Sequence, residues 1–586
     1  MAPPFMQAGY SANYTQKILD GIIFEIMRLS IDTPANDDGV TDFPTCTPDQ
    51  IRRIHLVEAS IKKFLARTRP FAAFDKGPPT RLYTDARLNP RAPEIAAARY
   101  SLRQYGTMCA EFYFLHQPPS PLWTSMTAYI PVVLEWVDLL HPMNRNIRPD
   151  PDSKDHHDIV YELLRLLDGI LKPMDPLMEE TRMFLERTES TRYALDLWCN
   201  LFRYSKTPRV DAAYKASFLA NTIVFRSYRG PEPWSQGSRV PAVISDSVAQ
   251  FTGYRPRRLC RTIARYGEAF RIPEADTLAR GMFTFASKLM DASRLLPAVC
   301  PREAIRSIVV SLDYYVKHRA WRVVEMVCFY LERLLRLTRD HRALEWAVND
   351  GLFRVYTDTV DTGVRMGALD QGFVGAVDGL AKVMRQGFVY WRVLRAFHRK
   401  NNGRLPSTHS FSAQHPASRY TLAAYEAIKP SMHRARVEWA ETVKQRCSFC
   451  KSTKAAIPIR ACSCRSVYYC SRVCQKRHWQ EHRQQCDWPE GQSAPRDMHF
   501  VMCITQDYVR RNERAIISLA QRVDPRRLHH ALITVDLGNE VIRHDVQVED
   551  AVELGEARTG TVIATWVDGT KALRLGIPDA SILLDR

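Results

Sequence analysis

The chain has 586 residues, which is too long for a single hydrophobic core and fits roughly three or four domains. Its 45% hydrophobic and 25% charged residues exclude a globally disordered or fibrous protein. Charged residues interrupt every long apolar stretch, and residues 1–16 lack the basic start and apolar core of a secretory signal. We therefore expect an intracellular protein, nuclear or cytoplasmic, that does not contact a membrane.

Residues 1–400 are predicted to form a mostly α-helical body, because apolar residues recur at three- and four-residue steps. Residues 159–171 show this pattern, and residues 321–350 show it again with Gly351 placed to end a helix. The apolar stripe of the second segment consists of Val324, Val327, Cys328, Leu331, Leu334 and Leu335. A solenoid-like array is one form of such a body, although the chain has no fixed repeat period.

Two segments interrupt the helical pattern. Residues 230–241 are rich in Gly, Pro and Ser, which predicts a subdivision of the body at that point. Residues 401–418 are rich in Ser, His, Asn and Pro, which predicts a linker. A further helix is predicted over residues 419–446, leading into a cluster of cysteines.

Seven of the fourteen cysteines fall between residues 447 and 486, and one histidine joins them. A structural zinc site needs four nitrogen or sulfur ligands, and pairs spaced by two or three residues present two ligands to one ion. Eight such ligands predict two closed zinc sites, and the lack of an Asp or Glu ligand favours a structural role. The candidate ligands are Cys447, Cys450, Cys462, Cys464, Cys470, Cys474, His482 and Cys486.

The pattern CSFC…CSCRSVYYCSRVCQKRHWQEHRQQC resembles the MYND finger, a family of zinc-binding modules. In that family the ligand pairs alternate between two ions. The resemblance implies one site from Cys447, Cys450, Cys470 and Cys474, and another from Cys462, Cys464, His482 and Cys486. The long helical region with a late finger and a short tail also resembles proteins of fungi.

One feature departs from the family pattern, since only Ser463 separates Cys462 from Cys464 where two residues are usual. The shortened knuckle makes Cys462 the least secure ligand, and a distorted second site or the use of His478 as a ligand are the alternatives.

The resemblance also implies a binding surface for a short, proline-containing peptide of a partner protein. Its residues are Gln475 and Trp479, which share a helical face, and Ser463, whose position the short knuckle puts in question. In the alternative interpretation, Trp479 packs only against the zinc knuckles. We expect an adaptor for protein interaction on these grounds.

Two other functions compete with this expectation. Residues 444–486 contain ten Lys or Arg and one acid, so a nucleic-acid-associated regulator could use the basic finger, unless these cations only offset the thiolate ligands. An enzyme with an unrecognised site in the helical body is the third class. Since the chain lacks the motifs of SET methyltransferases, P-loop proteins and α/β-hydrolases, we expect no enzyme.

The last segment, residues 496–586, is predicted to form a small α+β region. A helix is predicted over 502–522, and strands are predicted over 531–537, 541–548, 561–567 and 570–576. Asp568 and Gly569 predict a tight hairpin between the last two strands.

Overall fold

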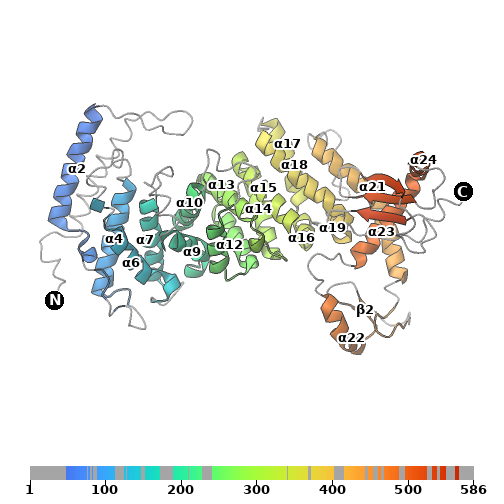
Figure 1. Ribbon diagram of the computed structural model, residues 1–586, viewed down its shortest axis with the longest axis horizontal. Helices are drawn as coiled ribbons and strands as arrows, with labels where there is room; N and C mark the ends of the chain where they lie inside the picture. Colours follow the sequence, from blue (N-terminus) through green and yellow to red (C-terminus); the bar gives the residue numbers. More distant parts are fainter. Residues whose placement is uncertain are drawn as a thin grey trace. The chain divides into compact units, whose positions relative to one another are not determined.

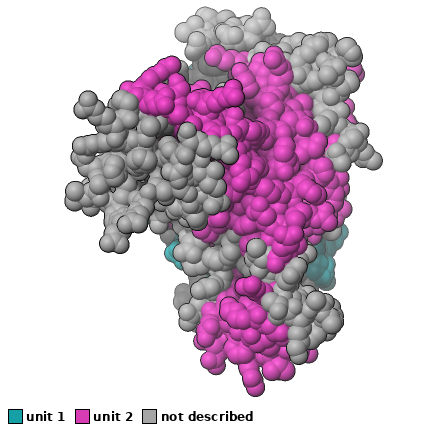
Figure 2. Space-filling model, turned by 90° about the vertical axis from the view of Figure 1, so that its right-hand side faces the viewer, with its two compact units in different colours: residues 1–255 teal, residues 256–586 magenta. Residues whose placement is uncertain are grey.

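The computed structural model describes most of the chain between residues 48 and 565. The described residues are 48–75, 77–79, 82, 89–111, 125–126, 128–146, 152–171, 189–206, 208, 210–227, 240–338, 341–366, 371–401, 415–442, 446–452, 460–462, 467–486, 495–523, 531–537, 542–548 and 561–565. The fold is mostly α, and it divides into two compact units at residues 255 and 256, coloured separately in Figure 2. Among the described residues, no helix is both long and apolar enough to cross a membrane.

The described part of the first unit is helical (Figure 1). Its helices are α2 (Pro48–Thr68), α4 (Pro93–Glu111), α6 (Ile130–Leu140), α7 (Lys154–Leu171), α9 (Glu189–Tyr204), α10 (Val210–Ser227) and α11 (Ala242–Phe251). Helix α7 packs against α4, α9 and α10, and α9 also packs against α11. The predicted subdivision at residues 230–241 falls almost wholly outside the described residues.

Helices α4 and α7 approach closely because a glycine lies at their crossing. A Cβ atom on Gly106 would lie only 2.8 Å from the Cα atom of Leu166. Beside this crossing, the buried carboxylate of Glu162 accepts a hydrogen bond of 2.8 Å from Nε of Arg99 and a second bond from Arg103. In the predicted apolar stripe of residues 159–171, Val160, Leu163, Leu164 and Leu167 are buried.

The second unit begins with a helical array, which precedes the finger in the sequence. Its helices are α12 (Pro256–Ala269), α13 (Asp276–Leu289), α14 (Arg302–Lys317), α15 (Trp321–Leu337), α16 (Arg342–Asn349), α17 (Leu352–Arg365), α18 (Gln371–Gln386), α19 (Trp391–Asn401) and α21 (Pro416–Thr442). One row of contacts runs through α12, α14, α16 and α19, and another runs through α13, α15, α18 and α21. Two rows of this kind are the arrangement of an α-helical solenoid.

The segment at 321–350 is two helices rather than one, which corrects the sequence expectation. Helix α15 ends at Leu337, where the backbone of Thr338 becomes extended, and α16 begins only at Arg342. The six residues of the predicted stripe are all buried in α15. Gly351 follows α16 with a φ of 103°, a conformation that glycine adopts without strain.

Helix α21 connects the array to the finger, and it begins at Pro416, slightly before the predicted start at residue 419. Ser418 near its start shares a buried hydrogen bond of 2.8 Å with the Tyr356 hydroxyl. The helix ends at Thr442, before the predicted end at residue 446. Residues 402–414, the main part of the predicted linker, lie outside the described residues.

The C-terminal region combines two helices and a small sheet. The predicted helix over 502–522 is in fact α23 (Pro495–Arg511) and α24 (Glu513–Val523), interrupted at Asn512, whose side-chain amide donates to the Tyr508 carbonyl. Strands β3 (Ala531–Asp536), β4 (Arg543–Val548) and β5 (Thr561–Thr565) follow in the order β4-β3-β5. Strand β3 is antiparallel to β4 and parallel to β5. The predicted hairpin at 568–569 and the strand over 570–576 lie outside the described residues.

Candidate metal centre

The finger is built from two short strands and one helix, which Figure 1 shows around β2 and α22. Strand β1 (Arg460–Ala461) pairs antiparallel with β2 (Tyr468–Tyr469), so residues far apart in the finger sequence become neighbours. Helix α22 (Arg472–Cys486) follows β2 directly. This arrangement brings the cysteines before β1 beside those after β2.

Four cysteines form the first ligand group, and their sulfur atoms all lie within 4.8 Å of one another. Sγ of Cys470 lies 3.6 Å from Sγ of Cys450 and 3.5 Å from Sγ of Cys474. Tetrahedral zinc with Zn–S bonds of about 2.3 Å places its sulfurs about 3.8 Å apart, so the group fits one zinc ion. The group consists of Cys447, Cys450, Cys470 and Cys474.

Local backbone geometry prepares the first pair of this group. The Lys451 amide donates to the Cys447 carbonyl over 2.9 Å, and Lys451 adopts a φ of 58°, which is unusual for a residue with a side chain. The Cys447 amide in turn donates to the Ser452 carbonyl over 3.0 Å. These bonds form a tight turn, which directs Cys447 and Cys450 toward the centre of the first ligand group.

The thiol pKa values of this group favour the binding of a cation. Burial alone would raise the pKa of Cys447, but hydrogen bonds from backbone amides, that of Cys470 foremost, lower it to about 6. Hydrogen bonds with the sulfurs of Cys474, Cys450 and Cys447 raise the pKa of Cys470 to about 12. Four crowded thiols therefore cannot all ionise by themselves, whereas a bound zinc ion stabilises every thiolate.

The second ligand group contains Cys462, His482 and Cys486, all of them buried. Sγ of Cys462 lies 3.6 Å from Sγ of Cys486 and 3.3 Å from Nε2 of His482. Burial, and then the neighbouring His478, lower the pKa of His482, which favours the neutral imidazole that binds metal. Cys464, predicted as the fourth ligand, lies outside the described residues.

His478 belongs to neither of these groups. Its Nδ1 atom makes a hydrogen bond of 2.9 Å with the Tyr469 hydroxyl, and its ring stacks on that of His482 with centroids 5.8 Å apart. His478 thus borders a ligand of the second group without being one of the grouped side chains.

The core of the finger is made largely of the candidate ligands themselves. Its buried members are Tyr469 together with Cys447, Cys462 and Cys486, and Val467 packs against them. So small an apolar core contributes little stability, so the finger depends on bound metal for its fold. One hydrogen bond of 3.2 Å, from Nε1 of Trp439 to the Tyr468 hydroxyl, joins the finger to α21.

The predicted peptide-binding residues lie on α22, with one exception. Gln475 is half-buried, and Trp479 is 44% exposed while its ring meets that of His482 edge-on at 6.0 Å. Ser463 lies outside the described residues. Sequence reasoning missed a third group of ligand-type side chains, Glu438, His499 and Cys503, because Glu438 is distant from the other two in sequence.

Comparison with known proteins bears on the finger alone. Residues 447–486 match the family model described as the MYND finger. Neither a curated protein nor a solved structure matches the chain. The matched segment and the grouped cysteines together establish that residues 447–486 are a MYND finger, a zinc-binding module of a kind commonly used in protein interaction.

Proposed function

We propose that this protein is an interaction adaptor rather than an enzyme, and that its finger holds two zinc ions and binds a proline-containing peptide of a partner. The observation that carries the proposal is the position of Trp479. This indole is 44% exposed, yet it contacts His482 of the second ligand group. A metal centre thus supports a large apolar side chain that remains accessible to a partner.

The chemistry of the neighbouring side chains suits an extended peptide. An indole offers a flat apolar wall to a proline ring, and an extended peptide leaves its backbone groups unpaired. The amide of Gln475, one turn before Trp479 on α22, carries both a donor and an acceptor for such a backbone. Phe449, which is 37% exposed and 6.2 Å from the His478 ring, adds apolar surface on the same module.

Replacing Trp479 with alanine tests this assignment. Peptides selected from a displayed library of proline-containing sequences by the full-length chain should bind the variant about 30-fold more weakly or worse, a loss of about 2 kcal/mol. Both ligand groups should keep their zinc. Calorimetric titration gives the affinity, and elemental analysis gives the zinc content.

Val473→Ala is the control on the same helix, since Val473 is also an exposed apolar residue of α22, at 57%, although its replacement removes a smaller side chain. It should leave peptide affinity unchanged. Wild-type affinity in the zinc-loaded Trp479→Ala variant would contradict the assignment of Trp479 to peptide binding. Loss of zinc from that variant would assign Trp479 to the support of the knuckles instead.

Nucleic acid binding is the second candidate, and the basic surface of α22 favours it. Arg472, Lys476, Arg477 and Arg483 are all exposed, and Glu481 is the acidic residue of this helix. Phosphate contacts through these side chains would make affinity for DNA or RNA fall steeply with salt concentration. A steep slope that becomes shallower by about one unit or more in Lys476→Glu would favour this function over peptide binding.

A further inference from the structure

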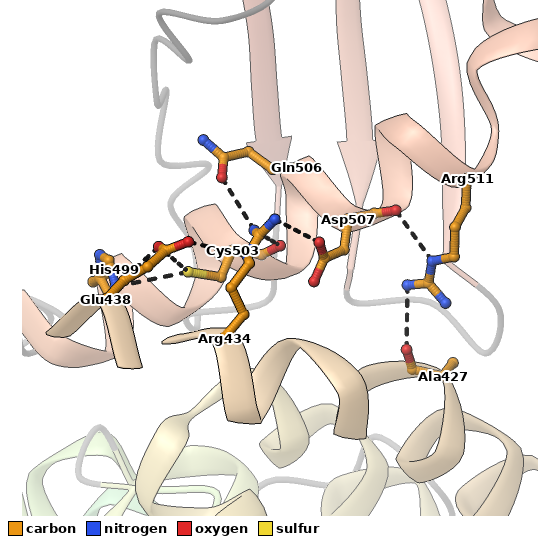
Figure 3. A network of polar contacts seen from close by, with 8 residues as sticks. All are labelled: Ala427, Arg434, Glu438, His499, Cys503, Gln506, Asp507 and Arg511. Carbon is orange, nitrogen blue, oxygen red and sulfur yellow. Dashed lines mark hydrogen bonds and ion pairs between the residues drawn. The ribbon is translucent and has the colours of Figure 1, made fainter. Parts of the chain in front are cut away.

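Helices α21 and α23 bring together three side chains of the types that bind transition metals. Glu438 comes from α21, whereas His499 and Cys503 lie one turn apart on α23, as Figure 3 shows. Oε2 of Glu438 lies 3.6 Å from Nε2 of His499 and 3.4 Å from Sγ of Cys503. The remaining separation, between Sγ of Cys503 and Nε2 of His499, is 3.7 Å.

These three separations match the edges of a tetrahedral coordination shell. Zinc bonds of about 2.0–2.3 Å to oxygen, nitrogen and sulfur place such ligands roughly 3.3–3.6 Å apart. We propose that Glu438, His499 and Cys503 form a third metal site, outside the finger, for zinc or a similar divalent ion. Water completes the coordination, since the described residues supply three ligands.

The surroundings hold the three ligands in place and balance their charge. Nε of Arg434 lies 3.4 Å from Oε1 of Glu438, which leaves Oε2 directed at the other two ligands. The same guanidinium donates to the Cys503 carbonyl over 2.6 Å and pairs with Asp507 over 2.6 Å (Figure 3). Because Arg434 and Asp507 neutralise each other, one thiolate and one carboxylate balance the two charges of the ion.

The sequence supports the same site independently of the distances. His499 and Cys503 have the spacing of His482 and Cys486 in the finger, so one turn of helix presents an imidazole and a thiol to one point in both cases. The alternative is a Cys503 thiol that donates its hydrogen to the Glu438 carboxylate with no metal between them.

Zinc content of the full-length chain decides between the site and this hydrogen bond. Equilibrated at the same raised concentration of free zinc, the wild type should bind one ion more than Cys503→Ser and His499→Gln. Cys109→Ser is the matched control, because it removes a buried thiol from the other unit and should keep the wild-type content.

Glu438→Gln tests the site in a variant that should still fold, because glutamine has the size and shape of this half-buried glutamate. With circular dichroism unchanged, it should also lower the zinc content by one. Equal zinc contents in the wild type and in all three ligand variants would overturn the site. Cobalt loading gives a second measure, since the difference spectrum between wild type and Cys503→Ser should contain a thiolate charge-transfer band.

A cavity of about 410 Å³ in the second unit carries an independent inference. Six arginines and one acid, Glu345, contribute to its lining. Three of the arginines occupy one face of α19 and the others come from α14, α16 and α23. The arginines are Arg302, Arg342, Arg392, Arg395, Arg399 and Arg496.

So many guanidinium groups around one cavity repel one another. Burial lowers the pKa of Arg496, and the charges of Arg395 and Arg392 lower it further against the opposing effect of Tyr468 and the buried Asp497. The guanidinium of Arg496 lies 4.4 Å from the centre of the Trp391 ring. A bound polyanion would relieve this repulsion through charge-assisted hydrogen bonds. The geometry points to a binding site for a small molecule that carries several phosphate groups.

Inorganic tripolyphosphate is the probe for this site, titrated into the full-length chain by calorimetry. Saturable binding should weaken about tenfold or more in Arg395→Glu. Lys400→Glu makes the same charge reversal on α19 outside the cavity lining and should bind as the wild type does. Equal weakening in the two variants, or no saturable binding at all, would refute a specific site.

Discussion

Replacing Cys470 with serine should release zinc from the finger and unfold residues 447–486, while the helical array outside the finger remains folded. Cys470 lies within 3.6 Å of two other sulfurs of the first ligand group, so its loss breaks that group at its centre. Structural zinc contributes about 10–16 kcal/mol to the folding of small fingers, and the few buried residues of this module cannot replace it.

Zinc analysis and hydrogen exchange together measure this outcome. At low free zinc, the wild type should hold two ions per chain and the variant fewer. Exchange should become fast throughout α22 and at the end of α21, where the Trp439 hydrogen bond to Tyr468 is lost. Lys476→Ala removes an exposed side chain of α22 and should change neither quantity. A collapse of total helicity in Cys470→Ser would show that the array needs the finger.

Replacing Gly106 with valine should destabilise the first unit by about 3 kcal/mol, the upper part of the usual range for overpacking. The new Cβ would lie 2.8 Å from the Cα of Leu166, and a backbone atom cannot move aside as a side chain can. Helices α4 and α7 would therefore have to separate, and the buried residues between them would lose contacts.

The measurement is urea unfolding, with limited proteolysis of the first unit as the readout, and it gives the change in the unfolding midpoint. Gly375→Ala is the control, because a Cβ at that position of α18 meets no atom within 4 Å. Because Gly375 lies in the second unit, alanine there should leave the midpoint of the first unit unchanged. Equal midpoints for Gly106→Val and the wild type would contradict the close approach of α4 and α7.

The helices and the finger could be predicted from the sequence because both depend on local spacing. The stripe from Val324 to Leu335 is buried as expected, and the strands over 531–536 and 543–548 form where alternation predicts them. The grouping of Cys447 and Cys450 with Cys470 and Cys474 followed from the family resemblance, since spacing alone permits other pairings.

Features that depend on distant residues could not be predicted in this way. The interruptions at Thr338 and Asn512 leave the apolar spacing on either side almost unchanged, so periodicity does not reveal them. The parallel pairing of β3 with β5 joins segments about thirty residues apart. Glu438 meets His499 and Cys503 only because α21 packs against α23.

Helix α22 supplies side chains to both ligand groups of the finger, Cys474 to the first and His482 and Cys486 to the second. Ordering this helix costs conformational entropy, and whichever ion binds first meets most of that cost. If the finger holds two ions, the second would bind a helix that is already formed and so bind more tightly than it would alone. By linkage, removal of either ion would weaken the hold on the other, so we expect such a finger to gain or lose its metals cooperatively.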